Sequence, residues 1–218
     1  MKKSIISIAL SATLATSALV STQASAEVAG IEGLSANVGL VSQYFFRGIE
    51  QTGTATASAG LDYENGGFYA GVWTADVEDG LEIDYYAGYG FEFENGLGLS
   101  AGYTLYAYTG GFDTQYNEFN FGASYGYVSV EYTVGEWEDG NGPGLDQDYD
   151  FLAITFEKDG FYGTYGTFGD EAEGDYIEVG YSTTISEFDA GISLIKADDD
   201  LTEGASGSSL VLSLSKSF

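Results

Sequence analysis

Every second residue from Leu81 to Phe93 is apolar or aromatic, and most residues between them are acidic or glycine. The first set is Leu81, Ile83, Tyr85, Ala87, Tyr89, Phe91 and Phe93. A period of two residues is typical of a β-strand with two chemically different faces. The run is also as long as a tilted strand that crosses a membrane, which needs roughly 9–11 residues. The pattern therefore predicts a strand with one apolar and one polar face.

The same alternation recurs along the chain, which indicates an all-β fold. It is clear in the segments Ala36–Phe46, Leu97–Leu105, Phe119–Tyr125, Val128–Val134 and Ile177–Tyr181. In the first of these, Tyr44 and Phe46 are expected on the apolar face with Val38 and Leu40. The segments near 68–75 and 161–168 carry aromatic residues on both faces, so alternation does not orient them. After residue 26 no apolar run approaches the roughly 20 residues of a membrane helix.

The connections between these segments alternate in length. Short turns are expected at Glu64–Gly67, Glu94–Gly96, Gly126, Glu157–Gly160 and Ile185–Glu187. Longer acidic links are expected at Gly48–Gly53, Ala75–Gly80, Thr109–Thr114, Gly135–Asp148, Gly169–Gly174 and Ala197–Gly207. Together they predict a single antiparallel transmembrane β-barrel of about twelve strands, with short periplasmic turns and longer acidic extracellular loops. A soluble β-sandwich or soluble barrel would also alternate, but it would not explain this asymmetry of the turns.

The two ends of the chain predict export and assembly. Lys2 and Lys3, an apolar stretch and the A-x-A site at Ala24–Ala26 indicate a secretory signal peptide over residues 1–26, leaving a barrel domain over 27–218. Apolar residues alternate up to a terminal aromatic residue, which resembles the signal read by the outer-membrane assembly machinery; they are Leu210, Leu212, Leu214 and Phe218. We therefore expect the cell outer membrane of a Gram-negative bacterium, with its lipid and lipopolysaccharide around the barrel.

Composition excludes several function classes. The formal net charge of −28 disfavours nucleic acid as a partner. The chain has no Cys and no His, so thiol chemistry, the usual general base and the favoured transition-metal ligand are missing. The acidic run Asp198–Asp200 does not follow the calcium-loop template. We therefore expect no enzyme, no metal and no cofactor.

Two stretches resemble a known proteobacterial family. They are NVGLVSQYFFRGIEQT at 37–52 and GLDYENGGFYAGVWTADV at 60–77, and EIDYYAGY at 82–89 continues the match. These residues are similar to the Gcw_chp family, also called the TorF family. The resemblance implies an outer-membrane location and a pore, and it implies no catalytic residues and no particular substrate.

The residues expected to face inward suggest what a pore would select. They are Arg47, Asp62, Glu82, Asp84, Glu92, Glu118, Glu131, Glu178 and Asp189. Rings of carboxylates favour cations, so we expect passive diffusion of small solutes, either cations or neutral molecules. Arg47 is expected near the outer end of the first strand, either constricting the mouth or, as we favour, paired with inward acids.

Three further features of the barrel stay open at this level. A barrel of this size leaves roughly 10 Å between side chains on opposite walls. Many inward positions are glycine, which favours an open lumen or instead relieves crowding in a packed one; we favour the open lumen. The loop Glu136–Asp148 is the best candidate to fold over or into the mouth. The alternative to a pore is a non-conducting barrel with a structural or surface-interaction role.

Overall fold

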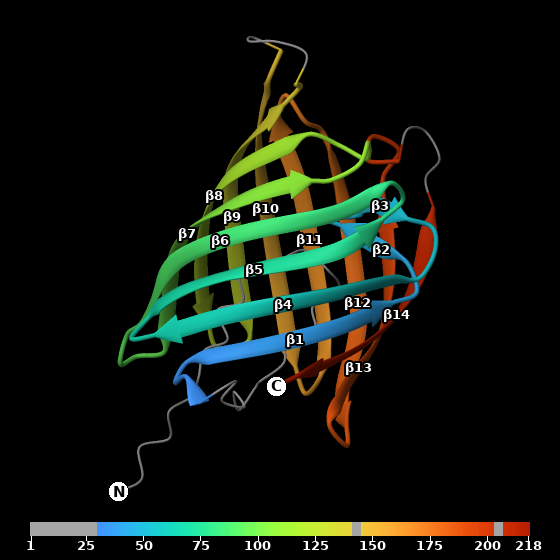
Figure 1. Ribbon diagram of the computed structural model, residues 1–218. Coiled ribbons are helices and arrows are strands. Elements are labelled where there is room, and N and C mark those ends of the chain that lie inside the picture. Colours follow the sequence, from blue (N-terminus) through green and yellow to red (C-terminus); the bar gives the residue numbers. More distant parts are fainter. Residues whose placement is uncertain (1–29, 141–144, 203–206) are drawn as a thin grey trace, which may run out of the picture.

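Twelve strands of the described chain close into an antiparallel barrel (Figure 1). The computed structural model describes residues 30–140, 145–202 and 207–218; the expected signal peptide over 1–26 lies outside them. The barrel strands are β1 (Leu34–Val41), β4 (Thr56–Asn65), β5 (Phe68–Val77), β6 (Gly80–Glu92), β7 (Leu97–Tyr108), β8 (Gln115–Tyr125), β9 (Val128–Glu138), β10 (Gln147–Lys158), β11 (Phe161–Asp170), β12 (Gly174–Ile185), β13 (Phe188–Ala197) and β14 (Ser208–Ser217).

Neighbours in sequence pair as neighbours in the barrel, and β1 closes it against β14. In that last pair Val38 lies opposite Lys216 and Leu40 opposite Leu214. The backbone N–H of Phe218 donates to the carbonyl of Ala36 at 2.8 Å. The start of β1 and the end of the chain therefore lie at the same end of the barrel, as an even number of strands requires.

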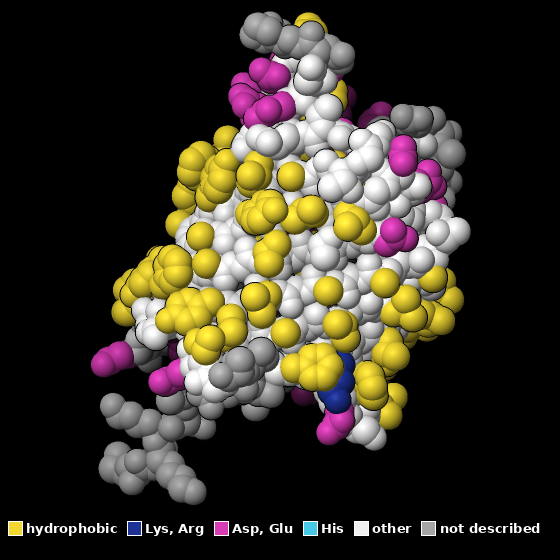
Figure 2. All heavy atoms as spheres, viewed as in Figure 1, with side chains coloured by type: hydrophobic (Ala, Val, Ile, Leu, Met, Phe, Trp, Pro, Cys, Tyr) yellow, Lys and Arg dark blue, Asp and Glu magenta, His cyan; other side chains and the backbone are white. Residues whose placement is uncertain are grey.

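The outer wall carries the apolar face of each strand. Outward side chains such as Leu40, Tyr85 and Val179 are each about half exposed, at 51%, 49% and 49%. Hydrophobic side chains cover the wall in Figure 2, and acidic side chains gather toward its two ends. In a soluble protein such a surface would be buried, so a closed barrel with this belt fits a lipid surround. In the part of the chain that the structure describes, no helix has the length and hydropathy of a membrane span.

The end of the barrel with the chain terminus has short turns and a ring of aromatic side chains. Phe68, Phe93, Tyr125, Phe156, Phe161, Phe188 and Phe218 are all exposed there. Two lysines lie among these rings: Lys158 over Tyr127, and Lys216 between Phe188 and Phe218 at 5.4 and 5.1 Å from the ring centroids. Lys216 also pairs with Glu187 at 2.7 Å and thereby lowers the pKa of that carboxyl. Cations and aromatic rings at this level are typical of a membrane interface.

At the opposite end the predicted pattern of long loops is only partly right. The links at 109–114 and 198–207 are long, but β5 and β6 are joined by residues 78–79 alone, and β11 and β12 by 171–173. The predicted links Ala75–Gly80 and Gly169–Gly174 are wrong in length because the strands extend into them. The acidic residues there, such as Asp76 and Asp170, stand at strand ends rather than in long loops.

The structure orients the two strands that alternation leaves ambiguous. In β5 the odd positions face inward, with Trp73, Ala75 and Val77 all buried. In β11 the even positions face inward, and Gly166 is buried while Tyr165 is exposed. The inward face of β5 is apolar because it packs against a segment inside the barrel, which is described next.

Candidate functional site

A small hairpin inside the barrel forms the candidate site. After β1 ends at Val41 the chain turns inward and forms β2 (Tyr44–Phe46) and β3 (Ile49–Thr52), a separate two-stranded sheet. The chain returns to the wall at β4. The expectation that Tyr44 and Phe46 extend the apolar face of the first strand is wrong. Tyr44 is 2% exposed, whereas Val38 and Leu40 on the barrel wall are 47% and 51% exposed.

The contacts of this hairpin reach strands all around the barrel, which places it across the lumen. Tyr44 packs on Trp73 of β5 with ring centroids 5.9 Å apart, and Phe46 packs edge-on against Tyr106 of β7 at 5.5 Å. On the other side, Phe45 joins a buried cluster with residues of β10, β12, β13 and β14, namely Phe151, Ala153, Tyr176, Ile195, Ala197 and Val211. The hairpin therefore fills the lumen at this level.

The tip of the hairpin is a two-residue turn, Arg47–Gly48. Both residues have positive φ, 47° and 84°, as the tight turn of a two-residue hairpin requires. Glycine suits the second position because a Cβ there would lie 2.7 Å from the Cβ and Cγ of Tyr176. Arginine is an unusual choice for the first, since a side chain at positive φ is strained. The contacts of Arg47 must therefore hold the turn in place.

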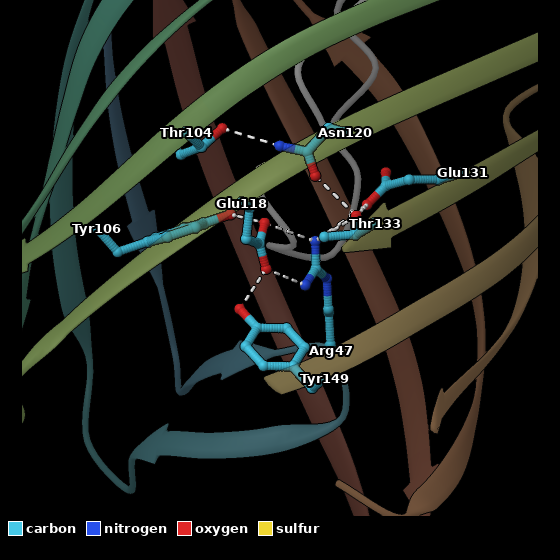
Figure 3. Close-up of polar contacts among 8 residues, drawn as sticks. All are labelled: Arg47, Thr104, Tyr106, Glu118, Asn120, Glu131, Thr133 and Tyr149. Carbon is cyan, nitrogen blue, oxygen red and sulfur yellow. Dashed lines mark hydrogen bonds and ion pairs between the residues drawn. The ribbon is translucent and has the colours of Figure 1, made fainter. Parts of the chain in front are cut away.

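Arg47 is 2% exposed and binds two carboxylates of the opposite wall (Figure 3). Its Nη1 donates to Glu118 Oε1 at 2.5 Å and its Nη2 to Glu118 Oε2 at 3.1 Å. The same Nη2 donates to Glu131 Oε1 at 3.1 Å and to the hydroxyl of Thr133 at 3.3 Å. The guanidinium also lies 4.2 Å from the ring centroid of Phe151. The bidentate, charge-assisted pair between Arg47 and Glu118 is the strong form of an ion pair.

Glu118 is the centre of this network. It is fully buried and accepts hydrogen bonds from the hydroxyls of Tyr106 at 2.8 Å and Tyr149 at 2.7 Å, in addition to those from Arg47. Tyr149 lies flat over Gly135, where a Cβ would meet the ring at 2.3 Å. The glycine on β9 thus lets the tyrosine of β10 reach Glu118. The arrangement buries Glu118 and both tyrosines in this layer of the lumen.

The structure brings some of the predicted lumen residues together and leaves others apart. Arg47, Glu118 and Glu131 meet in the network, and Glu82 and Asp84 lie buried beside the hairpin. Nearer the end with short turns, Asp62 binds Asn37 and Tyr86, and Glu178 binds Tyr162. Asp189 accepts a hydrogen bond from Thr184, whereas Glu92 is exposed at the end of β6. The predicted position of Arg47 is wrong as well: it lies at the tip of the inserted hairpin, between β2 and β3, and not near the outer end of the first strand.

Tyrosines, not empty space, account for several of the inward glycines. A Cβ at Gly88 or Gly102 would lie 2.2 or 2.3 Å from the hydroxyl of Tyr69, and one at Gly180 would lie 2.5 Å from the ring of Tyr162. The glycines make room for a ring from the neighbouring strand. The crowding explanation therefore holds at these positions, and these three glycines do not support the open lumen that we favoured.

Sequence reasoning missed the hairpin, although signals for it exist. Tyr44, Phe45 and Phe46 are three consecutive aromatic residues, which a wall strand with one polar face does not accommodate. Arg-Gly follows them directly, and it occupies the turn. The two ends of the loop that we expected to fold over or into the mouth, Glu136–Asp148, belong to β9, which ends at Glu138, and to β10, which starts at Gln147; its residues 141–144 lie outside the described part, so this expectation stays a prediction.

Comparison with known proteins places this architecture in a family. A family model described as "Bacterial protein of unknown function (Gcw_chp)" matches residues 25–194, most of the chain. The chain belongs to the Gcw_chp family. This match confirms the resemblance seen in the first half of the chain. Comparison with curated protein sequences gives no match.

Solved structures similar to this Gcw_chp chain include membrane proteins. One, from a study of the in-meso crystallisation of membrane proteins, has a TM-score of 0.60 and 13% identity over 85% of this chain and 83% of its own. Pseudomonas aeruginosa OprD has a TM-score of 0.43 and 13% identity over 86% of this chain and 67% of its own. Acinetobacter baumannii OccAB3 has a TM-score of 0.44 and 12% identity over 87% and 66%. At these identities the first likeness shows the fold.

Proposed function

We propose that this protein is an outer-membrane channel for passive diffusion of small solutes, and that the β2–β3 hairpin is its constriction. The observation that carries the proposal is the hairpin itself: a short sheet inserted across a closed barrel and held to the far wall through Arg47. A barrel of this size needs no inserted segment for closure, because its wall is complete without β2 and β3. An internal segment that crosses the lumen is the natural place to control passage.

The charges around the constriction support a preference for cations or neutral solutes over anions. Four carboxylates lie around the hairpin, Glu82, Asp84, Glu118 and Glu131, against one arginine that pairs with the last two, so the fixed charge of this layer is negative. Fixed carboxylates attract cations and repel anions in a low-dielectric passage. The proposal includes export through the signal peptide with cleavage after Ala26, and insertion by the outer-membrane assembly machinery into lipopolysaccharide-containing membrane.

Conductance in planar bilayers tests the proposal directly. Gly48→Ala places a methyl group against Tyr176 and strains the turn, so it should displace the hairpin and raise the single-channel conductance above that of the wild type. Gly96→Ala is the matched control, because Gly96 has nearly the same φ (85° against 84°) but no atom within 4 Å of the added Cβ. It should leave the conductance unchanged. A potassium chloride gradient should give a reversal potential of the sign expected for cations.

The second candidate is a non-conducting barrel with a structural or surface-interaction role. The specific observation in its favour is the buried layer around the hairpin, where Asp84, Glu118 and Thr133 are all 0% exposed. The same recordings separate the two functions. If both the wild type and Gly48→Ala fail to conduct although they fold as barrels, the channel proposal is wrong and the non-conducting barrel remains.

A further inference from the structure

Two carboxylates of β6 lie buried beside the hairpin with unused oxygen atoms. Glu82 is 1% exposed and Asp84 is 0% exposed. Glu82 Oε1 accepts a hydrogen bond from the hydroxyl of Tyr44 at 2.7 Å; Tyr108 also lies near this carboxylate, but no donor is placed with hydrogen-bond geometry to Glu82 Oε2. Neither carboxylate oxygen of Asp84 has one. These residues take no part in the Arg47 network.

The charge of this region is not balanced by the described residues. Arg47 is the one buried cation among them, and it is held by Glu118 and Glu131. The groups that act electrostatically on Asp84 are Glu82 and Glu118, which are also acidic. An ionised carboxylate that is buried without a counter-charge is strongly unfavourable. Two neighbouring ones, at alternate positions of the same strand face, call for a compensating positive charge.

The residues around Glu82 and Asp84 indicate which kind of cation would supply this positive charge. Asp84 lies between Trp73 and Tyr106 in the sheet register, and Glu82 lies between Ala75 and Tyr108. The available ligand atoms are carboxylate and phenol oxygens, which suit hard cations. The described residues contain no group of three or more acidic, His or Cys side chains able to hold a metal ion. The protein thus supplies two carboxylates, which is the number that Mg²⁺ commonly takes while keeping several waters.

We propose that Glu82 and Asp84 together bind one partly hydrated, hard divalent cation beside the hairpin. The two negative charges match one divalent ion, and Tyr44, which donates to Glu82, links the bound ion to β2. The cation would therefore stabilise the inserted position of the hairpin. This inference does not require that the barrel conducts, so it stands or falls separately from the channel proposal.

Calorimetry with Mg²⁺ tests the binding. The full mature barrel is stripped with a chelator while unfolded, refolded into detergent and titrated at high ionic strength, which screens the exposed acidic loops. A single saturable site is expected in the wild type and should be lost in Glu82→Gln/Asp84→Asn. Glu178→Gln is the matched control, because Glu178 is also a buried inward carboxylate but is bound by Tyr162. It should retain the site. No saturable binding, or equal binding in the double variant, overturns the proposal.

Fluorescence gives a second readout that locates the ion. The chain has two tryptophans, and Trp73 lies opposite Asp84 in the register. In a Trp137→Phe background, paramagnetic Mn²⁺ should quench the emission of Trp73 in a saturable way, and excess Mg²⁺ should reverse the quenching. If the double variant does not fold, Asp84→Asn alone replaces it, with at least a tenfold loss in apparent affinity expected. Quenching that does not saturate, or that Mg²⁺ does not reverse, places the ion elsewhere and overturns the proposal.

Discussion

At the scale of single residues, Arg47 shows how one side chain can fix an element that the local sequence does not stabilise. Its backbone is at φ 47°, a region that costs a residue other than glycine on the order of 1–3 kcal/mol. It also lies buried, where an unpaired guanidinium would be unfavourable. The hydrogen bonds to Glu118, Glu131 and Thr133 and the contact with Phe151 offset both costs. The ion pair therefore stabilises the fold only when both partners are present, because either partner alone would be an unpaired buried charge.

A double-mutant cycle tests this residue pair. Arg47→Met leaves Glu118 buried without its cation and should lower the free energy of unfolding by about 3–5 kcal/mol. Glu118→Gln in the same chain removes the orphaned charge and keeps one acceptor oxygen, while its amide NH2 can donate to the hydroxyl of the other tyrosine of the pair Tyr106 and Tyr149, so the double variant should recover part of that loss. The measurement is equilibrium unfolding in urea in the presence of lipid vesicles. Strictly additive losses would mean that the two side chains do not interact.

At the scale of elements, the wall strands could be predicted from the sequence, whereas the hairpin could not. Alternation fixes which side of a strand a residue occupies, because the side-chain period is two. It does not fix where the strand leaves the sheet. Tyr44 stands at an even position, like Val38 and Leu40, whose side chains face outward. Because β1 ends at Val41, Tyr44 is no longer part of the wall, and its side chain is buried inside the barrel. The Arg47 partners come from β8 and β9, more than seventy residues away, and no local pattern encodes such a contact.

The last strand is the element for which the sequence suggested a role in assembly. Leu210, Leu212 and Leu214 face outward, at 57%, 53% and 44% exposure, and Phe218 follows on the same side at 44%. Phe218→Ala should lower the amount of heat-modifiable barrel in the outer-membrane fraction severalfold. Phe188→Ala is the matched control, since Phe188 is equally exposed at 44% and also contacts Lys216. An equal loss in both variants would indicate aromatic anchoring at the interface in place of a terminal signal.

At the scale of the whole molecule, the outer and inner surfaces of the barrel differ in composition. The outer surface is an apolar belt that any barrel in lipid needs, and the sequence predicts it from alternation alone. The inner surface is apolar where it packs against the hairpin and otherwise rich in tyrosine and polar residues, with rings lying over glycines of the neighbouring strands. Closing the sheet removes its edges, so backbone hydrogen bonds are complete without the hairpin. The wall is therefore complete without the hairpin, which is the physical basis for our proposal that the hairpin is a constriction.

Arginine substitutions at two depths of the same strand test whether the outer surface of the barrel faces lipid. Val179 lies at the middle of β12 and faces outward at 49% exposure, and Ile185 lies at the end of the same strand at 61%. If lipid surrounds the wall, Val179→Arg places a charge near the midplane and should cost about 2–4 kcal/mol, while Ile185→Arg near the interface should cost about 0–1 kcal/mol. Unfolding in phospholipid vesicles measures both. Because the two side chains are apolar, outward and on one strand, a soluble fold offers no reason for this order, and equal costs would contradict a membrane-spanning barrel.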